Sequence, residues 1–415
     1  MNAASNSFDT LIIGAGVGGA RAAESALSCD DKQHVLLVNE EEWEPYDRPP
    51  LSKDVLLGDS DTGDFQLLDE TLRAHPRLVV KSGVRAAHLD PHARTVQLSD
   101  GSVCSYRSLI IATGSKARTL DPAIVDAGVE ADLLYLKTLG DALCLRKRLA
   151  GAAGCRLVVI GAGFIGLEVA AAARRLGCDV TVVEAGSRIV SRGAPPLVAE
   201  FLKARHEREG VRFELGAQPE RISRTGPGLE IRIADGRTIN GDLVVVGIGT
   251  TANDTLAAEA GLDCDNGILV DECCRTSDPS IYAIGDVARI RSAGLAPALR
   301  MEHWQAARVM GETAARNACG AEDPYQDVPW VWTDQYDLNL QFLGHTSERN
   351  RCVIRGDVAA GKWTLIEQDG DTVVAATLVN SGRDRRTIER LIERKIEVKD
   401  DSLSDPTLDL KTLLR

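Results

Sequence analysis

The sequence contains two glycine triplets whose spacing predicts dinucleotide binding. Each follows an apolar run: the first is Gly14, Gly16 and Gly19, and the second is Gly161, Gly163 and Gly166. In the pattern G-x-G-x-x-G, the first glycine makes a tight turn. The second lets a pyrophosphate approach the backbone, and the third lets the helix pack on the strand. The helix that follows offers free N–H groups and the positive end of its dipole to the phosphates.

An acidic residue closes each of these units. Glu40 and Glu184 follow their triplets at the spacing of about 20 residues that suits a carboxylate bound to ribose hydroxyls. One triplet alone is a weak signal, and the alternative is a pair of ordinary strand–helix turns in an α/β protein. Two copies, each between an apolar strand and a closing acid, instead favour two dinucleotide cofactors that exchange electrons.

Two strand–turn–helix–strand units, residues 8–40 and 157–184, must position these turns. The loop at 44–57 is stiffened by prolines and carries Arg48 and Lys53, although Lys53 could equally be a solvated lysine. Asp286 ends a strand at 276–288, where it could accept hydrogen bonds from a polyol chain or cap a helix.

Composition narrows the class of protein. The chain has 415 residues, which suggests two or three domains, and its net charge of −13 argues against a nucleic-acid or anionic-membrane partner. No apolar run reaches the roughly 20 residues of a membrane helix, and no signal peptide is recognisable. The ten cysteines form no C-x-x-C or zinc pattern, and residues 41–64 contain none. We therefore expect a cytoplasmic protein with reduced thiols and no metal site.

The last part of the chain predicts a separate α+β domain. A proline-broken linker is expected at 322–332. Alternating patterns then predict strands at 339–344, 352–355, 363–368 and 372–378 and a helix at 384–394.

Several of these motifs occur together in one known group. The segments PYDRPPLSK, GAGFIGLEVA, TSDPSIYAIGDVA and VPWVWTDQYDLNLQFLG resemble those of the FAD-dependent ferredoxin reductases of bacterial oxygenase systems, which are related to apoptosis-inducing factor. The resemblance covers nearly the whole chain. It implies an α/β fold with two Rossmann-like dinucleotide-binding domains, one inserted in the other, plus an α+β C-terminal domain. The implied boundaries are 1–115 and 250–323 for the FAD domain, 116–249 for the NAD(H) domain and 324–415 for the C-terminal reductase domain.

The resemblance also implies which residues contact the cofactors. For FAD these are Gly14, Ala15, Gly16, Gly19, Glu40, Arg48, Pro49, Lys53, Val84, Ala112, Thr113, Gly114, Lys137, Gly285, Asp286, Trp304 and Trp332. For NADH they are Gly161, Gly163, Ile165, Gly166, Glu184 and Gly249. Three positions depart from the group's usual pattern: Lys137 replaces a common arginine, and Ala306 and Met310 replace polar residues.

Two further residues are implied to act in the reaction. Glu168 matches the glutamate that approaches the nicotinamide, and Lys53 matches its lysine partner, a pair expected to position the nicotinamide. Glu184 should repel a 2′-phosphate and so favour NADH over NADPH, although Arg188 four residues later could soften that preference.

The missing cysteine pair decides how electrons are expected to leave. Disulfide reductases of this architecture need C-x-x-x-x-C or C-x-x-C, so electrons should leave the flavin directly, and the flavin would release them singly to a one-electron carrier. The partner implied by the resemblance is a [2Fe-2S] ferredoxin, in some members of the group a rubredoxin. Its expected docking face carries Arg289, Arg291, Arg300 and Arg308. The alternatives are a redox-sensing interaction protein like apoptosis-inducing factor, or an NADH oxidase.

Overall fold

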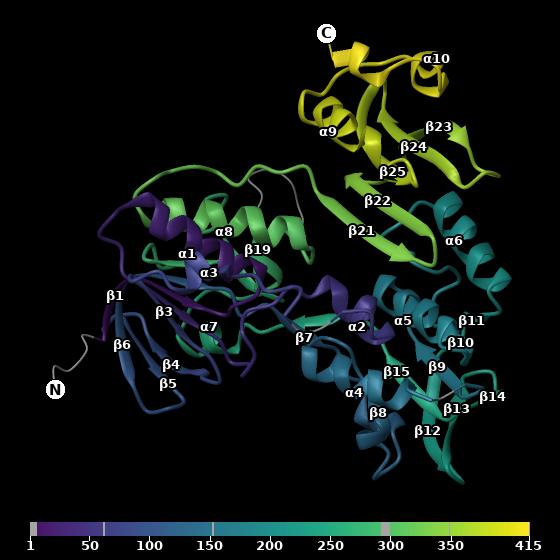
Figure 1. Ribbon diagram of the computed structural model, residues 1–415, viewed down its shortest axis with the longest axis horizontal. Helices are drawn as coiled ribbons and strands as arrows, with labels where there is room; N and C mark the ends of the chain where they lie inside the picture. The colour runs from purple at the N-terminus through teal and green to yellow at the C-terminus, as the bar shows by residue number, and fades with distance from the viewer. Residues whose placement is uncertain (1–5, 61–62, 152, 292–298, 348, 415) are drawn as a thin grey trace. The chain divides into compact units, whose positions relative to one another are not determined.

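The structure is a computed structural model that describes residues 6–60, 63–151, 153–291, 299–347 and 349–414. The chain forms two compact units (Figure 1). Unit 1 comprises residues 1–48, 62–116 and 250–327, and unit 2 comprises residues 49–61, 117–249 and 328–415. The division into three domains stays a prediction. The units group residues 49–61 and 328–415 with the second nucleotide fold.

Unit 1 is built on a mainly parallel sheet. Its parallel strands are β3 (Leu78–Lys81), β2 (Val35–Val38), β1 (Ser7–Ile13), β6 (Val103–Ile111) and β18 (Ile281–Ala283). Strands β5 (Thr95–Leu98) and β4 (Ala86–Asp90) continue the sheet in antiparallel direction from β6. A smaller sheet joins β17 (Ile268–Val270), β19 (Ala288–Ile290) and β20 (Leu299–Arg300). The short elements of the unit are α3 (Glu70–Arg73), α7 (Thr255–Glu259) and the strand β16 (Thr250–Ala252).

Two helices of unit 1, α1 (Val17–Cys29) and α8 (Trp304–Ala318), lie side by side (Figure 1). Glycine makes their close approach possible, because a Cβ on Gly311 would lie 2.4 Å from the carbonyl oxygen of Gly18. Gly18 and Gly311 thus set how closely α1 and α8 can pack.

Unit 2 contains the second parallel sheet. Its strands, in order, are β11 (Arg212–Leu215), β10 (Asp179–Glu184), β9 (Arg156–Ile160), β15 (Leu243–Val246) and β8 (Leu133–Leu134). Its helices are α4 (Leu139–Leu149), α5 (Phe164–Arg175) and α6 (Pro196–Arg208). An antiparallel sheet of β12 (Pro219–Thr225), β13 (Gly228–Ile233) and β14 (Thr238–Gly241) follows α6 and β11. The proline-rich loop forms a short 3-10 turn at Pro49–Ser52 and helix α2 (Asp54–Leu57), which pack against α4 and α5.

The C-terminal part of unit 2 is an antiparallel sheet with two helices. The strand order is β21 (Trp330–Gln335), β22 (Leu338–Gly344), β25 (Thr372–Val379), β24 (Lys362–Asp369) and β23 (Arg351–Asp357). The helices are α9 (Arg385–Glu393) and α10 (Asp400–Ser404). The predicted strands and helix are confirmed, but the predicted linker was wrong at its end because β21 begins at Trp330. The residues after Pro329, from Trp330 to Thr333, are aromatic and β-branched, and this composition favours a strand. The mixed α/β fold class is confirmed.

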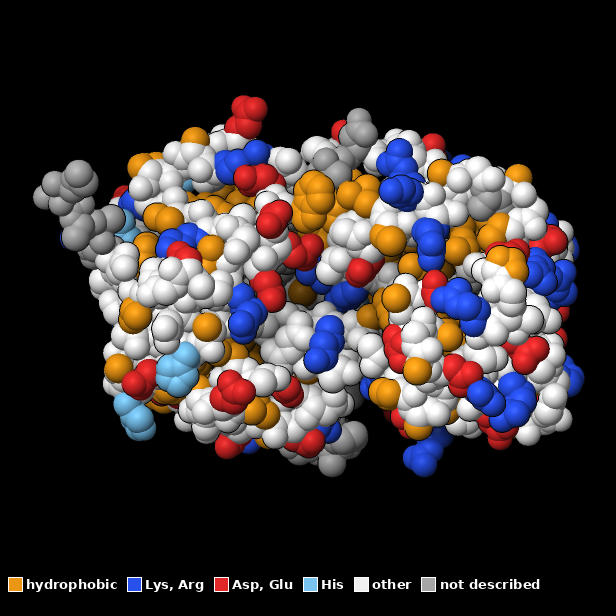
Figure 2. Space-filling model, turned by 90° about the horizontal axis from the view of Figure 1, so that it is seen from below, with side chains coloured by type: hydrophobic (Ala, Val, Ile, Leu, Met, Phe, Trp, Pro, Cys, Tyr) orange, Lys and Arg blue, Asp and Glu red, His pale blue; other side chains and the backbone are white. Residues whose placement is uncertain are grey.

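The surface carries acidic and basic side chains next to one another. On the face drawn in Figure 2, Asp and Glu are interspersed with Lys and Arg, so the excess negative charge is not gathered in one region of that face. Among the described residues, no helix is long and apolar enough to cross a membrane. The same residues contain no group of three or more His, Cys, Asp and Glu that could hold a metal ion.

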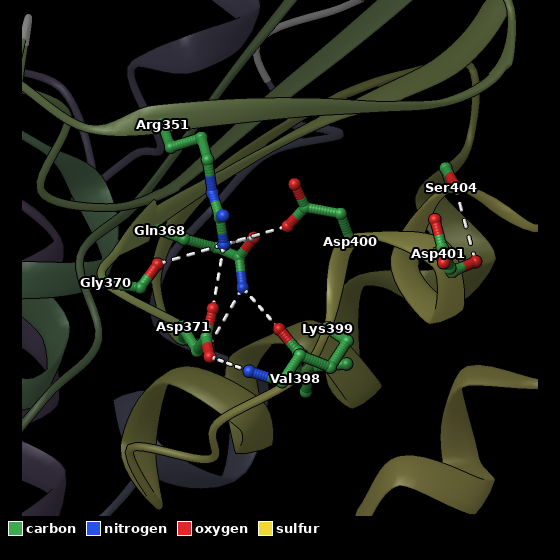
Figure 3. Close-up of polar contacts among 9 residues, drawn as sticks. All are labelled: Arg351, Gln368, Gly370, Asp371, Val398, Lys399, Asp400, Asp401 and Ser404. Carbon is green, nitrogen blue, oxygen red and sulfur yellow. Dashed lines mark hydrogen bonds and ion pairs between the residues drawn. The ribbon is translucent and has the colours of Figure 1, made fainter.

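One polar cluster attaches α10 to the C-terminal sheet (Figure 3). Arg351 on β23 forms ion pairs with Asp371 at 3.0 Å and Asp400 at 2.8 Å. The buried amide of Gln368 donates to the carbonyl oxygens of Asp371 and Val398, at 2.9 and 2.7 Å. These contacts come from residues far apart in the sequence, so they fix the path of the chain into α10.

Candidate functional site

The first glycine turn has the geometry that its spacing predicts. Gly14 lies directly after β1 with φ 107°, and a Cβ there would lie 2.2 Å from the carbonyl oxygen of Ala112. A Cβ on Gly19 would lie 1.9 Å from the carbonyl oxygen of Gly14, so only glycine lets α1 approach the turn. Gly16 is the N-cap of α1 and provides no side-chain hydrogen bond, and a Cβ on it would meet nothing within 4 Å. Open space therefore faces the uncapped amides of α1, which suits a pyrophosphate.

Further residues predicted to contact FAD follow β2 and β3 in the chain. Glu40 is exposed, and its nearest cation in the described structure is Arg85, 3.9 Å away. The backbone N–H of Val84 donates to the carbonyl oxygen of Asn39 at 3.0 Å. Arg48 pairs at 3.1 Å with Glu41, a residue that the sequence analysis did not select.

The remaining predicted contacts of unit 1 have defined partners. The hydroxyl of Ser115 donates to Asp286 at 2.7 Å, so Asp286 is held at its strand end. The cap of α8 is His303, whose ring nitrogen accepts from the N–H of Ala306, and not Asp286. The indole of Trp304 donates to Asp47 at 2.7 Å. Burial raises the pKa of Asp47, and the Trp304 contact opposes that shift.

Three predicted positions close strand ends of unit 1. The hydroxyl of Thr113 donates to the carbonyl oxygen of Asn253 at 2.8 Å, and the Asn253 amide donates back to the carbonyl oxygen of Thr113 at 2.9 Å. Gly114 and Gly285 both have positive φ, 66° in each case. Ala15 is buried within the glycine turn. Glycine and reciprocal bonds thus shape the loops at the carboxyl ends of β6 and β18, where α/β sheets bind ligands.

The second glycine turn repeats the first in unit 2. Gly161 has φ 105°, and a Cβ there would lie 2.4 Å from the carbonyl oxygen of Gly247. A Cβ on Gly166 would lie 2.2 Å from the carbonyl oxygen of Gly161. Gly163 is the N-cap of α5 and provides no side-chain hydrogen bond, and Ile165 in the first turn of α5 is 47% exposed. An uncapped helix end with open space is again present.

Glu184 lies at the edge of this second turn. Its carboxylate accepts from the backbone N–H groups of Ala162 at 2.8 Å and Gly186 at 2.7 Å. Arg188, the residue that could soften a preference for NADH, instead donates to the carbonyl oxygens of Ala194 and Ser191, at 2.7 and 3.2 Å. Glu184 is therefore held at the turn, and Arg188 is bound to backbone carbonyl groups.

The other predicted contacts of unit 2 lie on several elements. Lys137 precedes α4, and its N–H donates to Asp141 at 3.0 Å. Gly249 follows β15 with φ 107°. Pro49 begins the 3-10 turn that leads to Lys53. Trp332 on β21 stacks on Trp330 with ring centroids 4.8 Å apart.

Glu168 and Lys53 are brought together, as the sequence predicts, within a larger polar cluster. Glu168 on α5 is 5% exposed, and its Oε1 lies 3.5 Å from Lys53 Nζ. The hydroxyl of Thr333 on β21 donates to Glu168 Oε1 at 2.5 Å, and the hydroxyl of Ser52 donates to Oε2. Lys53 also pairs with Asp334 at 2.9 Å. The sequence analysis missed Ser52, Thr333 and Asp334 as partners, although all three lie in motifs that it singled out.

Opposing effects act on the Glu168 carboxyl. Burial is the larger effect and raises its pKa, whereas Lys53 and the two hydroxyls lower it. Lys53 Nζ also lies 5.8 Å from the centroid of the Trp332 ring. The cluster therefore presents a buried carboxyl of fixed orientation, with one ammonium shared between two acids.

The cysteines have the character of structural thiols. All ten are free. Burial raises the pKa of Cys155 and Cys264 to about 11 and that of Cys319 to about 12. Such thiols are mostly protonated at neutral pH and are poor nucleophiles.

Comparison with known proteins assigns this arrangement to a family. The pyridine nucleotide-disulphide oxidoreductase family matches residues 8–311, and the reductase C-terminal family matches residues 330–414. The chain belongs to the pyridine nucleotide-disulphide oxidoreductase family. It is 41% identical, over 97% of its length and 98% of the relative's, to the ferredoxin–NAD(+) reductase component of the anthranilate 1,2-dioxygenase system of Burkholderia cepacia.

Solved structures agree over the whole chain. The ferredoxin reductase for the CYP199A2 system of Rhodopseudomonas palustris has a TM-score of 0.92 and 34% identity, covering 99% of this chain and 100% of that one. The reductase in the covalent putidaredoxin reductase–putidaredoxin complex has a TM-score of 0.91 and 31% identity, covering 99% of each chain.

Family membership gives FAD and NAD(H) as the cofactors, and the two turns fit them. In each turn, a Cβ added to the first or third glycine would clash with backbone atoms. Each turn also has an uncapped helix N-terminus and open space beside its second glycine. Which further residues contact each cofactor stays a prediction.

Proposed function

We propose that the chain is an NADH-dependent ferredoxin reductase that serves an oxygenase. The observation that carries this proposal is the pair of dinucleotide turns in one chain that also has the reductase C-terminal domain. Two relatives that match over nearly their whole length are named ferredoxin–NAD(+) reductase components of dioxygenase systems.

The properties of the thiols support electron transfer from the flavin without a redox-active disulfide. Residues 41–64 contain no cysteine, and burial raises the pKa of the two cysteines that flank the second turn, Cys155 and Cys178. Bound FAD supplies the conversion of a two-electron transfer from NADH into single-electron steps. In this proposal the protein contributes binding and orientation.

Each predicted site residue then has a physical task. The turns at Gly14 and Gly161 hold the pyrophosphates of FAD and NADH, and Glu184 binds the adenosine ribose of NADH. Glu168 and Lys53 orient the nicotinamide, because both are held by polar contacts within the unit that carries the NADH turn. In the proposal Asp286 and Trp304 contact FAD from unit 1, and the protein acts in the bacterial cytoplasm.

The proposed ferredoxin-docking face is less basic than its sequence suggests. Arg289 pairs with Asp265 at 2.6 Å, and Arg291 pairs with Asp263 at 2.8 Å. Arg300 pairs with Glu302 in the same way. Asp263 and Asp265 precede the stretch from Arg289 to Arg308 that supplies the predicted arginines.

Arg308 differs from these three arginines in its surroundings. Its guanidinium lies 6.0 Å from the centroid of the Trp304 ring, and its contact with Gln305 is to a neutral amide. We therefore assign most of the docking charge to Arg308, because it forms no ion pair among the described residues, and the acid whose charge it interacts with, Glu312, is paired with Arg21 at 2.9 Å.

The decisive experiment is an anaerobic stopped-flow mixture of the FAD-loaded protein with NADH, followed by a [2Fe-2S] ferredoxin. Rapid flavin bleaching and rapid reoxidation by ferredoxin are expected. Bleaching that persists when ferredoxin is added would support a redox sensor instead, and rapid reoxidation by oxygen alone would support an oxidase.

The docking assignment is tested in the same instrument. Arg308→Glu should slow reoxidation by ferredoxin about tenfold at low ionic strength and weaken its salt dependence. Arg316→Glu is the matched control on α8, because Arg316 is already paired with Asp323. Equal effects of the two substitutions would contradict the assignment.

A further inference from the structure

Strand β21 continues into a polar run that the cofactor turns do not explain. Thr333 and Gln335 lie on its buried face, 0% and 1% exposed, whereas Asp334 between them reaches Lys53. His206 on α6 is 0% exposed and contacts Gln335. A continuous hydrogen-bonded chain thus runs from Tyr336 to the Glu168 cluster, entirely within unit 2.

Each bond of this chain sets the direction of the next. His206 Nε2 lies 2.6 Å from Gln335 Oε1, and an amide oxygen only accepts, so Nε2 carries the proton. The unprotonated Nδ1 then accepts from the hydroxyl of Tyr336 at 3.0 Å.

The direction continues through the amide of Gln335. Its Nε2 donates to Thr333 Oγ1 at 2.9 Å. Because the Thr333 oxygen accepts this bond, its single proton is directed to Glu168 Oε1 at 2.5 Å.

The opposite direction would change the contact at Glu168. If His206 carried its proton on Nδ1, the amide of Gln335 would have to turn around to donate to Nε2. The amide oxygen would then face Thr333 and accept its hydroxyl proton, so Glu168 would lose a donor.

We propose that His206 and Gln335 are positioning residues for Glu168. They keep the Thr333 hydroxyl pointing at the buried carboxyl, and this hydrogen bond fixes the orientation in which Glu168 meets the nicotinamide. This inference rests on the proposed function, in which Glu168 orients the nicotinamide. Neither residue touches a reacting atom, so both act through Thr333.

The surroundings of His206 keep the chain in one state. Burial, together with nearby Arg205, lowers the pKa of His206 to about 4, while Gln335 and Glu209 oppose that shift, so the ring is neutral at physiological pH. Burial raises the pKa of the Tyr336 phenol, which therefore keeps its proton.

The backbone of Tyr336 is consistent with a constrained role. Its φ is 59°, a left-handed conformation that a bulky residue seldom adopts. The ring centroids of Tyr336 and His206 lie 5.1 Å apart. The Arg205 guanidinium lies 5.0 Å from the centroid of the Tyr336 ring. Such strain persists where the surrounding contacts determine the conformation.

The first test needs no turnover. The FAD-loaded protein is labelled with ¹⁵N-histidine, and the His206 signal is assigned by its loss in His206→Gln. Long-range ¹H–¹⁵N spectra at pH 7.5 should show His206 with Nε2 protonated and Nδ1 unprotonated. A protonated Nδ1, or a mixture of the two tautomers, would overturn the proposal.

The second test measures the effect on flavin reduction. Gln335→Met keeps the volume but removes both amide bonds, and the limiting rate of reduction by NADH should fall about tenfold with a nearly unchanged NADH dissociation constant. Thr333→Val should behave in the same way, and Thr333→Ser should restore the rate because it keeps the hydroxyl.

The matched control is Thr377→Val. Thr377 is 2% exposed on β25 of the same sheet, and its substitution should leave the limiting rate at the wild-type value. A wild-type rate in Gln335→Met, or an equal loss in Thr377→Val, would refute the positioning role. Failure of NADH to reduce the wild-type flavin would instead refute the proposed function, and the His206 spectra would still decide the chain's direction.

Discussion

The buried neutral His206 predicts a specific dependence of stability on pH. Its folded-state pKa is about 4, against 6.5 for the unperturbed side chain. Above pH 6.5 the ring is neutral in both states and has no effect. As the pH falls from 6.5 toward 4, the unfolded chain takes up a proton that the folded chain does not, so stability is lost.

The magnitude follows from the size of the shift. A displacement of about 2.5 pKa units corresponds to about 3 kcal/mol once the pH is below both pKa values. At pH 5 the loss relative to pH 7.5 should be about 2 kcal/mol. Glu168 has the opposite sign, because its raised pKa lets the folded state take up a proton first as the pH falls.

The assay compares the wild type with His206→Gln, which keeps an amide donor but cannot titrate. Urea unfolding of both FAD-loaded proteins is followed by tryptophan fluorescence at pH 7.5 and pH 5. The wild type should lose about 2 kcal/mol more than the variant between the two pH values, since Glu168 titrates in both proteins and its effect cancels.

A control on the same helix separates the titration from simple destabilisation. Leu202 on α6 is 0% exposed, and Leu202→Ala should cost about 2–5 kcal/mol at both pH values without changing the pH dependence. Parallel pH dependence in the wild type and His206→Gln would show that His206 is not held neutral in the fold, and the reasoning would fail.

Three other predictions follow from single contacts. Gly161→Ala should abolish flavin reduction by NADH while FAD stays bound, because the new Cβ would clash with the Gly247 carbonyl oxygen. Gly140→Ala is the control: its nearest neighbour would be 3.8 Å from the new Cβ, so flavin reduction and FAD binding should both be unchanged. Glu184→Ala should raise the ratio of kcat/KM for NADPH to that for NADH about tenfold, as measured by steady-state kinetics. Arg355→Met should destabilise the protein by about 3 kcal/mol and speed proteolysis near residue 405, because the buried guanidinium donates to the Leu403, Asp405 and Leu408 carbonyls.

The sequence predicted those parts of the fold whose signal is local. An apolar run, a glycine triplet and a closing acid lie within about 35 residues, and the corresponding strand, turn and helix are confirmed in both units. The end of the proline-rich linker was predicted wrongly, because Pro324 and Pro329 masked the strand that begins at Trp330.

Contacts between distant segments could not be predicted in the same way. The charge on Arg289 and Arg291 was overestimated because Asp265 and Asp263 lie on an earlier loop of unit 1. Arginines selected from one stretch of sequence carry no information about acidic partners on another. The ion pairs that reduce the charge of the proposed docking face could therefore be identified only in the structure.

Glu168 shows where sequence and structure meet. It is the one charged residue in the apolar run from Phe164 to Ala173, and a carboxyl buried without partners would cost several kcal/mol. That cost means that donors must come from other elements, but the sequence does not say which. In the structure the donors are Ser52 and Thr333, with Lys53 close by. A lone acid on a buried helical face is thus a signal for a polar cluster, and the hydroxyl donors are the part that only the fold identifies.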